Sequence, residues 1–336
     1  MCAEYLKKVS IIIPTYKRAE YIDRAILSIL HQTYTNYEII VVDDNNPKTE
    51  DRIKLEEKMK KYTDDRIIYI KHEKNMNGAV ARNTGIKKAT GDYITFLDDD
   101  DFFLKNRIEI LVKFLNENKQ YDAVYTSGCV LYKDLFYVKK SGNLKKEMLM
   151  LDPIIRTGSN MFFRKNVFDN IGMFDESFNR HQDIEFMVRF FDKFKIYALD
   201  KILVVKDDSI KRINWPNAEI TVKNREKFLE KFSKDLNEFE DKNYILQRNY
   251  LDLFFKICRT SDKKILNYVY EKIKSYGKIS FKNKIKIVIC SKFNFILNIK
   301  YFIKSLIVKF QISFGKKTVF SEIREYLNIK DEVYEK

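Results

Sequence analysis

Residues 9–46 read VSIIIPTYKRAEYIDRAILSILHQTYTNYEIIVVDDNN, and this stretch decides the fold of the first half of the chain. Its first apolar run, Val9–Ile13, predicts a buried strand whose hydrogen bonding stops at Pro14, because proline has no N–H donor. A second apolar run, closed by two aspartates, predicts another strand. Between the two runs, apolar side chains recur at helical spacing, at Ile22, Ala25, Ile26 and Ile29. The stretch therefore predicts a strand, a helix and a second strand.

The same alternation continues along the chain. Residues 50–62 predict a charged surface helix, and residues 66–70 and 92–97 predict two more strands. The segment between those strands predicts a helix that starts near Asn77 and stops at Gly91. Nearly uninterrupted apolar strands separated by helices are typical of a mainly parallel sheet covered on both faces. We therefore expect an α/β fold.

The composition and the pattern of the sequence change near residue 220, around NWPNAE. Beyond that point the chain is rich in lysine and aromatic residues, and it reads as helical. We predict a first domain of residues 1–220 and a mostly helical, basic region of residues 221–336. Within that region, residues 293–311 have apolar side chains on one helical face and lysines on the other. Such a helix can lie on an anionic membrane surface or pack on protein, including a second subunit, and both alternatives stay open.

The overall charge points to an anionic partner. The 336 residues include 63 Lys and Arg against 48 Asp and Glu, a net charge of +15. The partner could be nucleic acid, a membrane surface or a phosphorylated substrate. The hydrophobic content of 45% excludes global disorder. Four scattered cysteines and the absence of a signal-peptide pattern predict a reduced, cytoplasmic chain without a disulfide framework.

Polar side chains follow three of the predicted strands. They are Pro14-Thr15-Tyr16, Asp43-Asp44, and the run from Asp98 to Asp101. Ligands of parallel α/β sheets bind beyond the carboxyl ends of the strands. We therefore expect the three clusters to converge on one crevice.

The aspartate run, Asp98 to Asp101, is the most informative of these clusters. A divalent cation beside a diphosphate needs hard oxygen ligands, and one or two carboxylates supply enough of them. The alternative is an acidic loop in which Asp101 caps the following helix. Capping needs one residue, whereas four are present, so the metal site is favoured.

Three other groups have two interpretations each. Asp44 can end a turn or accept the imide N–H of a pyrimidine. Arg82, about one turn into a helix, can bind a phosphate or lie on the surface. Asp183 and Glu185 lie among apolar residues, where a carboxyl group gains proton affinity and can act as a base. Alternatively, Asp183 starts the helix and Glu185 pairs with Arg189.

Together these segments resemble the inverting glycosyltransferases of family 2, which have the nucleotide-sugar-binding GT-A fold, a Rossmann-like α/β fold. The resemblance spans residues 8 to about 205. Besides residues 9–46, it rests on NMNGAVARNTGIKKATGDYITFLDDDDF (75–102), TGSNMFFRKNVFDNIGMFDESF (157–178) and HQDIEFMVRF (181–190). It implies transfer of a sugar from a UDP- or dTDP-sugar to a saccharide hydroxyl, assisted by Mn²⁺ or Mg²⁺.

The resemblance also implies a role for each matching residue. The nucleoside pocket would be lined by Pro14, Thr15, Tyr16 and Arg18, with Asp44 on the pyrimidine and Arg82 near the ribose or diphosphate. Asp100 would be the metal ligand and Asp98 would lie nearer the ribose and donor sugar. Because four aspartates are consecutive, these two assignments could shift by one position, to Asp99 and Asp101.

The proposed general base is Asp183. Family members often have a glutamate before it, whereas this chain has Gln182. No histidine follows His181, so the late histidine that many members place near the metal has no counterpart here. The third protein ligand of the metal is therefore not identified.

The family also sets expectations for partners. The acceptor would be a saccharide, which can be lipid-linked, in the synthesis of a bacterial surface polysaccharide such as a capsule. The enzyme would be cytoplasmic, with peripheral contact to the inner face of the cell membrane, and could form a homo-oligomer. Two alternatives are a non-catalytic nucleotide-sugar-binding scaffold and a basic nucleic-acid-binding protein. The second is disfavoured, because no nucleic-acid-binding motif is present and four aspartates beside an anionic ligand require a cation.

Overall fold

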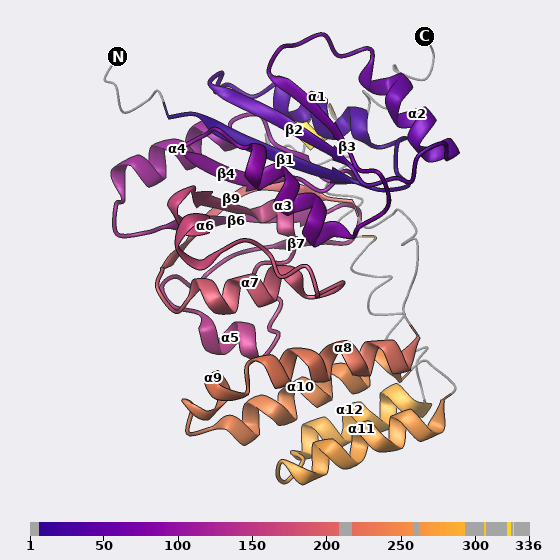
Figure 1. Cartoon of the computed structure of the whole chain (residues 1–336). Helices are drawn as coiled ribbons and strands as arrows, with labels where there is room; N and C mark the ends of the chain where they lie inside the picture. The colour runs from indigo at the N-terminus through magenta and orange to yellow at the C-terminus, as the bar shows by residue number, and fades with distance from the viewer. Residues whose placement is uncertain are drawn as a thin grey trace. The chain divides into compact units, whose positions relative to one another are not determined.

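The computed structural model describes residues 7–207, 217–258, 262–292, 306, 321–323 and 325. A sheet with helices packed on it is followed in the chain by a helical region (Figure 1). The chain divides into two compact units. The first contains residues 1–143, 154–211 and 305–336, and the second contains residues 144–153 and 212–304.

The strands and helices alternate up to β4, as the sequence predicts. The strands are β1 (Val9–Thr15), β2 (Tyr37–Asp43), β3 (Ile67–Lys71), β4 (Tyr93–Phe96), β5 (Phe102–Phe103), β6 (Ala123–Val130), β7 (Asp134–Phe136), β8 (Met161–Arg164) and β9 (Ile196–Lys206). The helices of the first unit are α1 (Ile22–Leu30), α2 (Glu50–Met59), α3 (Gly78–Lys88), α4 (Arg107–Glu117), α6 (Asn166–Ile171) and α7 (Gln182–Phe190), with the 3₁₀ turn η2 (Gly158–Asn160).

In the described part of the chain, nine strands form one sheet in the order β3-β2-β1-β4-β8-β6-β9-β5, with β7 paired to β6. The first four strands are mutually parallel. Beyond them β8 runs antiparallel to both β4 and β6, while β6 and β9 are parallel. The predicted α/β class is confirmed, and the sheet as a whole is mixed, because β8 returns between two strands that run the other way.

The first strand extends further than the sequence indicates. Strand β1 continues through Pro14 to Thr15, which pairs with Asp43 of β2. The pairing of β1 with β4 ends at Ile12, whose carbonyl accepts from Leu97 N at 2.9 Å. Alternate residues of β1 face alternate neighbours, so the missing donor of Pro14 points to the β4 side, where no further pairing is required.

Helix α3 packs closely on β1. It begins at Asn77, as predicted, because the Asn77 side chain accepts from the N–H groups of Ala79 and Val80. It ends at Lys88, before the predicted stop at Gly91. Gly91 has another function, because a Cβ atom there would lie 2.7 Å from the carbonyl oxygen of Lys8, at the start of β1.

The second unit is helical. Its helices are α5 (Lys145–Leu149), α8 (Ala218–Lys231), α9 (Ser233–Asn237), α10 (Lys242–Ile257), α11 (Lys263–Ser275) and α12 (Phe281–Lys292). The short α5 joins this unit through Asn249 Nδ2, which donates to Leu149 O at 2.7 Å, and through the Arg248–Asp152 ion pair of 2.6 Å. The predicted helical character of the C-terminal region is confirmed for its described residues. The boundary at residue 220 stays a prediction.

Three further expectations concern the C-terminal part. Cys258, next to the end of α10, is disulfide-bonded, so the expectation of a chain without disulfides is wrong at this position. Scattered spacing does not reveal which cysteines the fold brings together. The amphipathic stretch 293–311 lies outside the described residues, apart from residue 306. Among the described helices, none has both the length and the apolar character required to cross a membrane.

Gly85 provides a test of the α3–β1 packing. A Cβ atom at Gly85 would lie 2.3 Å from Cγ2 of Ile12, which is shorter than real Cβ contacts. We expect Gly85→Ala to lower the free energy of unfolding by about 1–3 kcal/mol, despite the better helix propensity of alanine. Urea unfolding would measure the change. Lys87→Ala, an exposed position on the same helix, should change stability by less than about 0.5 kcal/mol. A Gly85→Ala variant as stable as the parent would contradict this packing.

Candidate active site

The sheet topology brings the three predicted clusters to one edge. Strand β1 lies between β2 and β4, and all three run in the same direction. The amide of Asp44 donates to Thr15 O at 2.9 Å, which ties the end of β2 to the end of β1. The expected convergence of the strand ends is therefore present.

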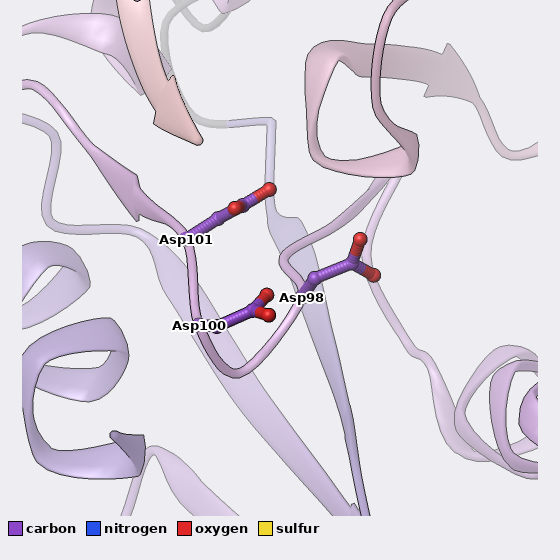
Figure 2. Close-up of side chains that lie close together, drawn as sticks. All are labelled: Asp98, Asp100 and Asp101. Carbon is purple, nitrogen blue, oxygen red and sulfur yellow. The ribbon is translucent and has the colours of Figure 1, made fainter. Parts of the chain in front are cut away.

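Three of the four consecutive aspartates face one another. Asp98, Asp100 and Asp101 each offer a carboxylate oxygen, and these oxygens lie within 4.8 Å of one another (Figure 2). The turn that follows β4 folds back on itself, since Asp101 N donates to Asp98 O at 2.9 Å. Asp99 is not part of the group. The arrangement is the donor set of a small divalent cation.

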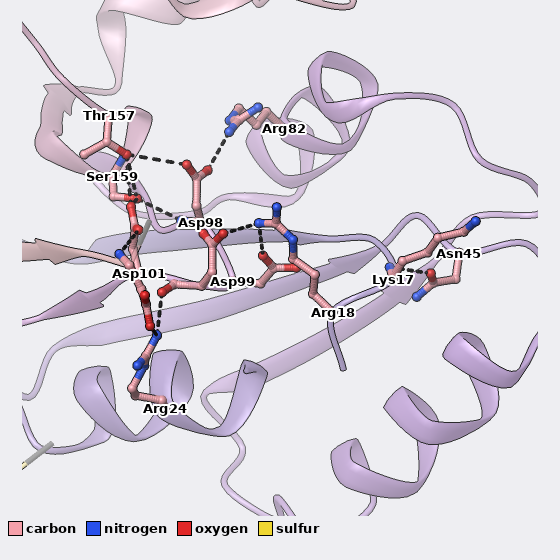
Figure 3. Close-up of polar contacts among 12 residues, drawn as sticks. Lys17, Arg18, Arg24, Asn45, Arg82, Asp98, Asp99, Asp101, Thr157 and Ser159 are labelled. Carbon is pink, nitrogen blue, oxygen red and sulfur yellow. Dashed lines mark hydrogen bonds and ion pairs between the residues drawn. The ribbon is translucent and has the colours of Figure 1, made fainter. Parts of the chain in front are cut away.

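Asp101 anchors the turn that contains η2. Its carboxylate accepts from Ser159 Oγ at 2.6 Å and from Thr157 Oγ1 at 3.0 Å (Figure 3). Ser159 Oγ also accepts from the backbone N–H of Asp98 at 2.9 Å. The alternative interpretation of Asp101 as a helix cap is wrong, because α4 starts only at Arg107.

Two arginines from the β1–α1 segment bind the outer side of the run. Arg18 donates to Asp100 and lies 3.5 Å from Asp99 Oδ1 (Figure 3). Arg24 donates to Asp100 O at 2.6 Å and pairs with Asp207 Oδ2 at 2.9 Å. These contacts give the acidic turn positive neighbours on the side of the predicted nucleoside pocket.

The acidic turn holds its protons unusually tightly. Burial, together with repulsion from Asp100, raises the pKa of Asp99 to about 7. Burial and repulsion from Asp98 raise the pKa of Asp100 to about 6. Burial, followed by repulsion from Asp100 and Asp98, raises the pKa of Asp101 well above its usual range. Attraction to Arg18 lowers the first two values without cancelling the rise. The protein leaves negative charge here that a bound cation would neutralise, so the residues present fit a divalent metal.

Asp98 also contacts α3. Its Oδ1 accepts from Arg82 Nη2 at 2.6 Å, and its Oδ2 lies 3.5 Å from Thr157 Oγ1 (Figure 3). Glycines leave room around this pair: Cβ atoms at Gly78 and Gly158 would lie 3.1 Å and 3.6 Å from the Arg82 guanidinium. Arg82 is therefore directed into the site and does not lie free on the surface.

Helix α7 contributes Gln182 and Asp183. Burial raises the pKa of Asp183, while the Arg82 charge lowers it and the Asp98 charge raises it, so Asp183 belongs to the same electrostatic site. Gln182 Nε2 would lie 3.2 Å from a Cβ at Gly78. No group of the described part of the chain donates to the buried Gln182 Oε1.

Glu185 has the structural role that the sequence left open. It is fully buried, and its carboxylate accepts from Arg189 Nε at 2.6 Å and from Nη2 at 2.9 Å. Arg189 in turn donates to Met173 O at 2.8 Å. The predicted Glu185–Arg189 pair is confirmed, and Glu185 is committed to it.

The carboxylate of Asp44 accepts four hydrogen bonds from within the protein. Its Oδ1 accepts from His72 Nδ1 and Met76 N, both at 2.8 Å, and its Oδ2 from Asn75 Nδ2 at 2.7 Å and Asn77 N at 3.0 Å. These four bonds occupy the acceptor sites of one carboxylate. Asp44 fixes the loop that leads into α3, and its contact with a pyrimidine stays a prediction.

The remaining pocket residues follow β1. Thr15 is buried, whereas Pro14 and Tyr16 are half-buried. The next residue, Lys17, has a positive φ of 57°, and its N–H donates to Asn45 Oδ1 at 2.8 Å (Figure 3). This tight turn leaves Tyr16 and Arg18 at the edge of the sheet, next to the end of β2.

Several functional neighbours were missed by the sequence reasoning. Ser159 and Thr157 hold Asp101, and the buried Arg107 holds their turn by donating to Ser159 O at 3.1 Å and Asn160 O at 2.9 Å. The segment TGSN, residues 157–160, contributed to the resemblance but indicated no contact with the aspartates. The contact depends on the pairing of β8 with β4, for which the sequence contains no signal.

The raised pKa values predict how stability depends on pH without metal. A group with a raised pKa binds its proton more tightly in the folded state, so the free energy of unfolding falls as pH rises from about 4 to about 7. We expect urea unfolding in chelator to show lower stability at pH 7.5 than at pH 5. Asp99→Asn, which removes one buried charge, should recover on the order of 1 kcal/mol at pH 7.5.

Asp64→Asn is the matched control for this experiment. Its partner Arg66 holds the pKa of Asp64 low, at about 2, so this carboxylate is ionised in both states above pH 5. The variant should keep the pH slope of the parent chain. An equally steep slope in the Asp99→Asn variant would show that the aspartate run does not cause it.

Comparison with known proteins agrees with this geometry. Residues 10–172 match the model of glycosyl transferase family 2. An uncharacterized glycosyltransferase of Rickettsia felis is 37% identical over 205 residues, which cover 58% of this chain and 32% of the relative. The putative colanic acid biosynthesis glycosyl transferase WcaA of Escherichia coli is 30% identical over 162 residues, covering 48% of this chain and 54% of that protein. The chain thus spans less than two thirds of the length of these relatives.

Solved structures share the fold. S. aureus TarS 1-349 in complex with UDP-GlcNAc superposes with a TM-score of 0.57 at 16% identity, over 80% of this chain and 89% of that one. Mannosyltransferase PcManGT from Pyrobaculum calidifontis, in complex with GDP-Man and Mn²⁺, gives 0.55 at 15% identity, over 93% and 88%. Residues 10–172 form a glycosyl transferase family 2 domain, and its fold is of the GT-A type.

Proposed function

We propose that this chain is an inverting glycosyltransferase that moves a sugar from a UDP- or dTDP-sugar to a hydroxyl of a saccharide acceptor. The reaction is a metal-assisted single displacement. The observation that carries this proposal is the meeting of Asp98 with two different groups. It lies within 4.8 Å of the oxygens of Asp100 and Asp101 and also pairs with Arg82 at 2.6 Å. The acidic group that fits a metal ion thus lies next to the guanidinium of Arg82, which suits a diphosphate.

Asp183 is the general base in this proposal. An inverting transfer needs one base, which takes the proton of the acceptor hydroxyl as that oxygen bonds to the anomeric carbon and the nucleoside diphosphate leaves. Burial raises the pKa of Asp183, which increases its affinity for that proton. The neighbouring Gln182 is neutral, so the usual second acid is missing while the base is kept. One carboxylate is sufficient, because no covalent intermediate is formed.

The other residues bind the donor. Pro14, Thr15, Tyr16 and Arg18 hold the nucleoside, Asp44 fixes the loop beside it, and Arg82 binds the ribose or diphosphate. A divalent cation, Mn²⁺ or Mg²⁺, held by Asp100 with Asp98 and Asp101 beside it, would stabilise the charge of the departing diphosphate. Asp98 would lie nearest the donor sugar. Asp99 would position this turn through Arg18.

The wider setting is proposed on the relatives and on charge. The likeness to a putative colanic acid biosynthesis enzyme supports a role in a bacterial surface polysaccharide such as a capsule. The acceptor is then a growing saccharide, which can be lipid-linked. We place the enzyme in the cytoplasm, with its basic region 221–336 in contact with the inner face of the cell membrane or with a second subunit.

The proposal is tested by nucleotide release from a panel of donors. UDP-glucose, UDP-galactose, UDP-N-acetylhexosamines, dTDP-sugars and GDP-mannose would each be incubated with Mn²⁺, with Mg²⁺ and with chelator. Metal-dependent release of UDP or dTDP from one donor is expected. Release that is unaffected by chelator, or a chain that binds none of these nucleotides, would overturn the proposal.

Asp183→Asn separates the base from donor binding. The substitution keeps the shape of the side chain and removes its basicity, so we expect kcat to fall by about 10²- to 10⁴-fold. The affinity for UDP, measured by calorimetry, should change little. Asp192→Asn, an exposed position just beyond the end of α7, is the matched control and should keep its activity. Comparable activity in the Asp183→Asn variant would assign the base to another residue.

Asp100→Asn tests the register of the metal site. The variant keeps one neutral oxygen and loses the negative charge, so metal-dependent UDP affinity should fall by at least about 10- to 100-fold. Titration of Mn²⁺ into the protein with UDP measures this. Asp99→Asn is the comparison, because Asp99 is not in the acidic group. A larger loss in the Asp99→Asn variant would shift the ligand by one position.

A further inference from the structure

Positive charge is concentrated in one short part of the helical unit. Residues 263–289, which form α11, the turn after it and most of α12, contain eight lysines and one glutamate. Their net charge is +7, about half of the +15 of the whole chain. The charge of this protein is therefore not spread evenly over its surface. It marks α11 and α12 as a contact for something anionic.

The same segment exposes large apolar side chains. On α12, Phe281 is 79% exposed, Ile285 is 43% exposed and Val288 is 48% exposed. These positions are four and three residues apart, so they lie within an arc of about 60° on one face of the helix. Ile287, which points to another face, is buried. Helix α12 therefore packs through one face and presents a separate apolar stripe to solvent.

Lysines flank the apolar stripe on both sides. On the helical wheel Lys284 lies on one side of Phe281, and Lys282 and Lys286 lie on the other, and all three are exposed. An apolar stripe between two rows of lysine is the pattern of a helix that lies in a membrane interface. The apolar side chains enter the acyl boundary while the long lysine side chains reach back to the headgroups. We call this stripe and its three lysines the α12 surface.

The positive charge of α11 and α12 also indicates which kind of partner binds the α12 surface. A second copy of the chain would place a segment of charge +7 against the same segment, and like charges in contact are unfavourable. A nucleic acid would satisfy the lysines, but its phosphate backbone offers nothing to Ile285 and Val288. An anionic lipid surface satisfies both features, because it combines negative headgroups with an apolar layer directly beneath them.

We propose that the α12 surface binds the protein to an anionic membrane, with Phe281 and Ile285 inserted at the headgroup boundary and the lysines of α11 and α12 on the headgroups. This inference deepens the proposed function and rests on it for its purpose, which is to bring the enzyme to a lipid-linked acceptor. It concerns the described residues of α11 and α12 and does not require the stretch 293–311.

The test is binding of the full chain to lipid vesicles by flotation, without donor or acceptor. Vesicles of phosphatidylcholine mixed with phosphatidylglycerol would be compared with vesicles of phosphatidylcholine alone, at low and at high ionic strength. We expect binding to the anionic vesicles only, weakened by salt. Equal binding to both, or to neither, would overturn the inference.

Variants locate the contact. Replacing Lys282, Lys284 and Lys286 by glutamine should reduce the partition coefficient by about 100-fold at low salt, because each lysine near an anionic surface contributes about fivefold. The double variant Phe281→Ser, Ile285→Ser should also reduce vesicle binding, because it removes the two side chains that insert at the headgroup boundary. The matched controls are Ile53→Ser on α2, an exposed apolar position of the other unit, and Lys113→Gln on α4. Unchanged binding in the α12 variants would assign the contact to another part of the chain.

Two further measurements keep this test separate from the proposed function. Nucleotide release from donor in solution should be unchanged in the α12 variants, so loss of vesicle binding together with loss of release would indicate misfolding, which circular dichroism of the variants would detect. Vesicle binding by a chain that releases no nucleotide would leave the membrane contact standing and refute the transfer reaction. Self-association that disappears with Phe281→Ser would instead identify a second copy as the occupant and refute the membrane contact.

Discussion

The site depends on holding four adjacent carboxylates, two buried and two half-buried, in one turn at the end of β4. Like charges at this spacing repel, and burial adds a desolvation cost to Asp99 and Asp101 above all. The chain meets this constraint by distributing the four side chains among different partners. Asp101 is held by two hydroxyl groups, Asp98 by Arg82, and Asp100 and Asp99 by Arg18. The negative charge that is not compensated in this way is what gives the turn its fit for a cation.

The partners of the aspartates come from segments that are distant in the chain. Arg18 follows β1, Arg82 lies on α3, and Ser159 belongs to the turn before β8. Each of these segments is fixed by contacts outside the site. Asp44 holds the loop that starts α3, and Arg107 holds the turn of Ser159 through two backbone carbonyls. The position of the acidic turn therefore depends on contacts outside it, and a substitution of Asp44 or Arg107 would act on the aspartates without touching them.

The two units have different physical characters. In the first unit, Arg18, Arg82 and Ser159 bind the aspartates that follow β4. In the second, the helices pack around a smaller core in which the buried Arg225 pairs with the half-buried Asp252 at 2.7 Å, while α12 exposes apolar side chains among lysines. A soluble surface seldom combines a largely exposed phenylalanine with such a density of one charge. The proposed donor site and the proposed membrane contact thus lie in separate parts of the chain.

The amino-acid sequence by itself determined the α/β class, the start of α3 at Asn77, the grouping of polar clusters at strand ends and the family resemblance. These features depend on local patterns: apolar runs, helical spacing and the side chains that directly follow a strand. It could not determine that β1 runs through Pro14, because this depends on which neighbour the missing donor faces. The antiparallel return of β8 likewise has no local signature, and neither does the disulfide of Cys258.

Only the tertiary structure decided which contacts each acidic residue makes. Four consecutive aspartates are equivalent in the sequence, and the register of a metal ligand cannot be read from identical letters. The turn after β4 sends Asp99 to Arg18 and turns the other three toward one another, and η2 then commits Asp101 to its hydroxyl partners. In the same way, Asp44 and Glu185 each had two sequence interpretations, and the structure fills their acceptor sites with partners from remote segments. The physical reason is that direction and burial of a side chain are set by contacts between distant segments, whereas the sequence pattern records only its near neighbours.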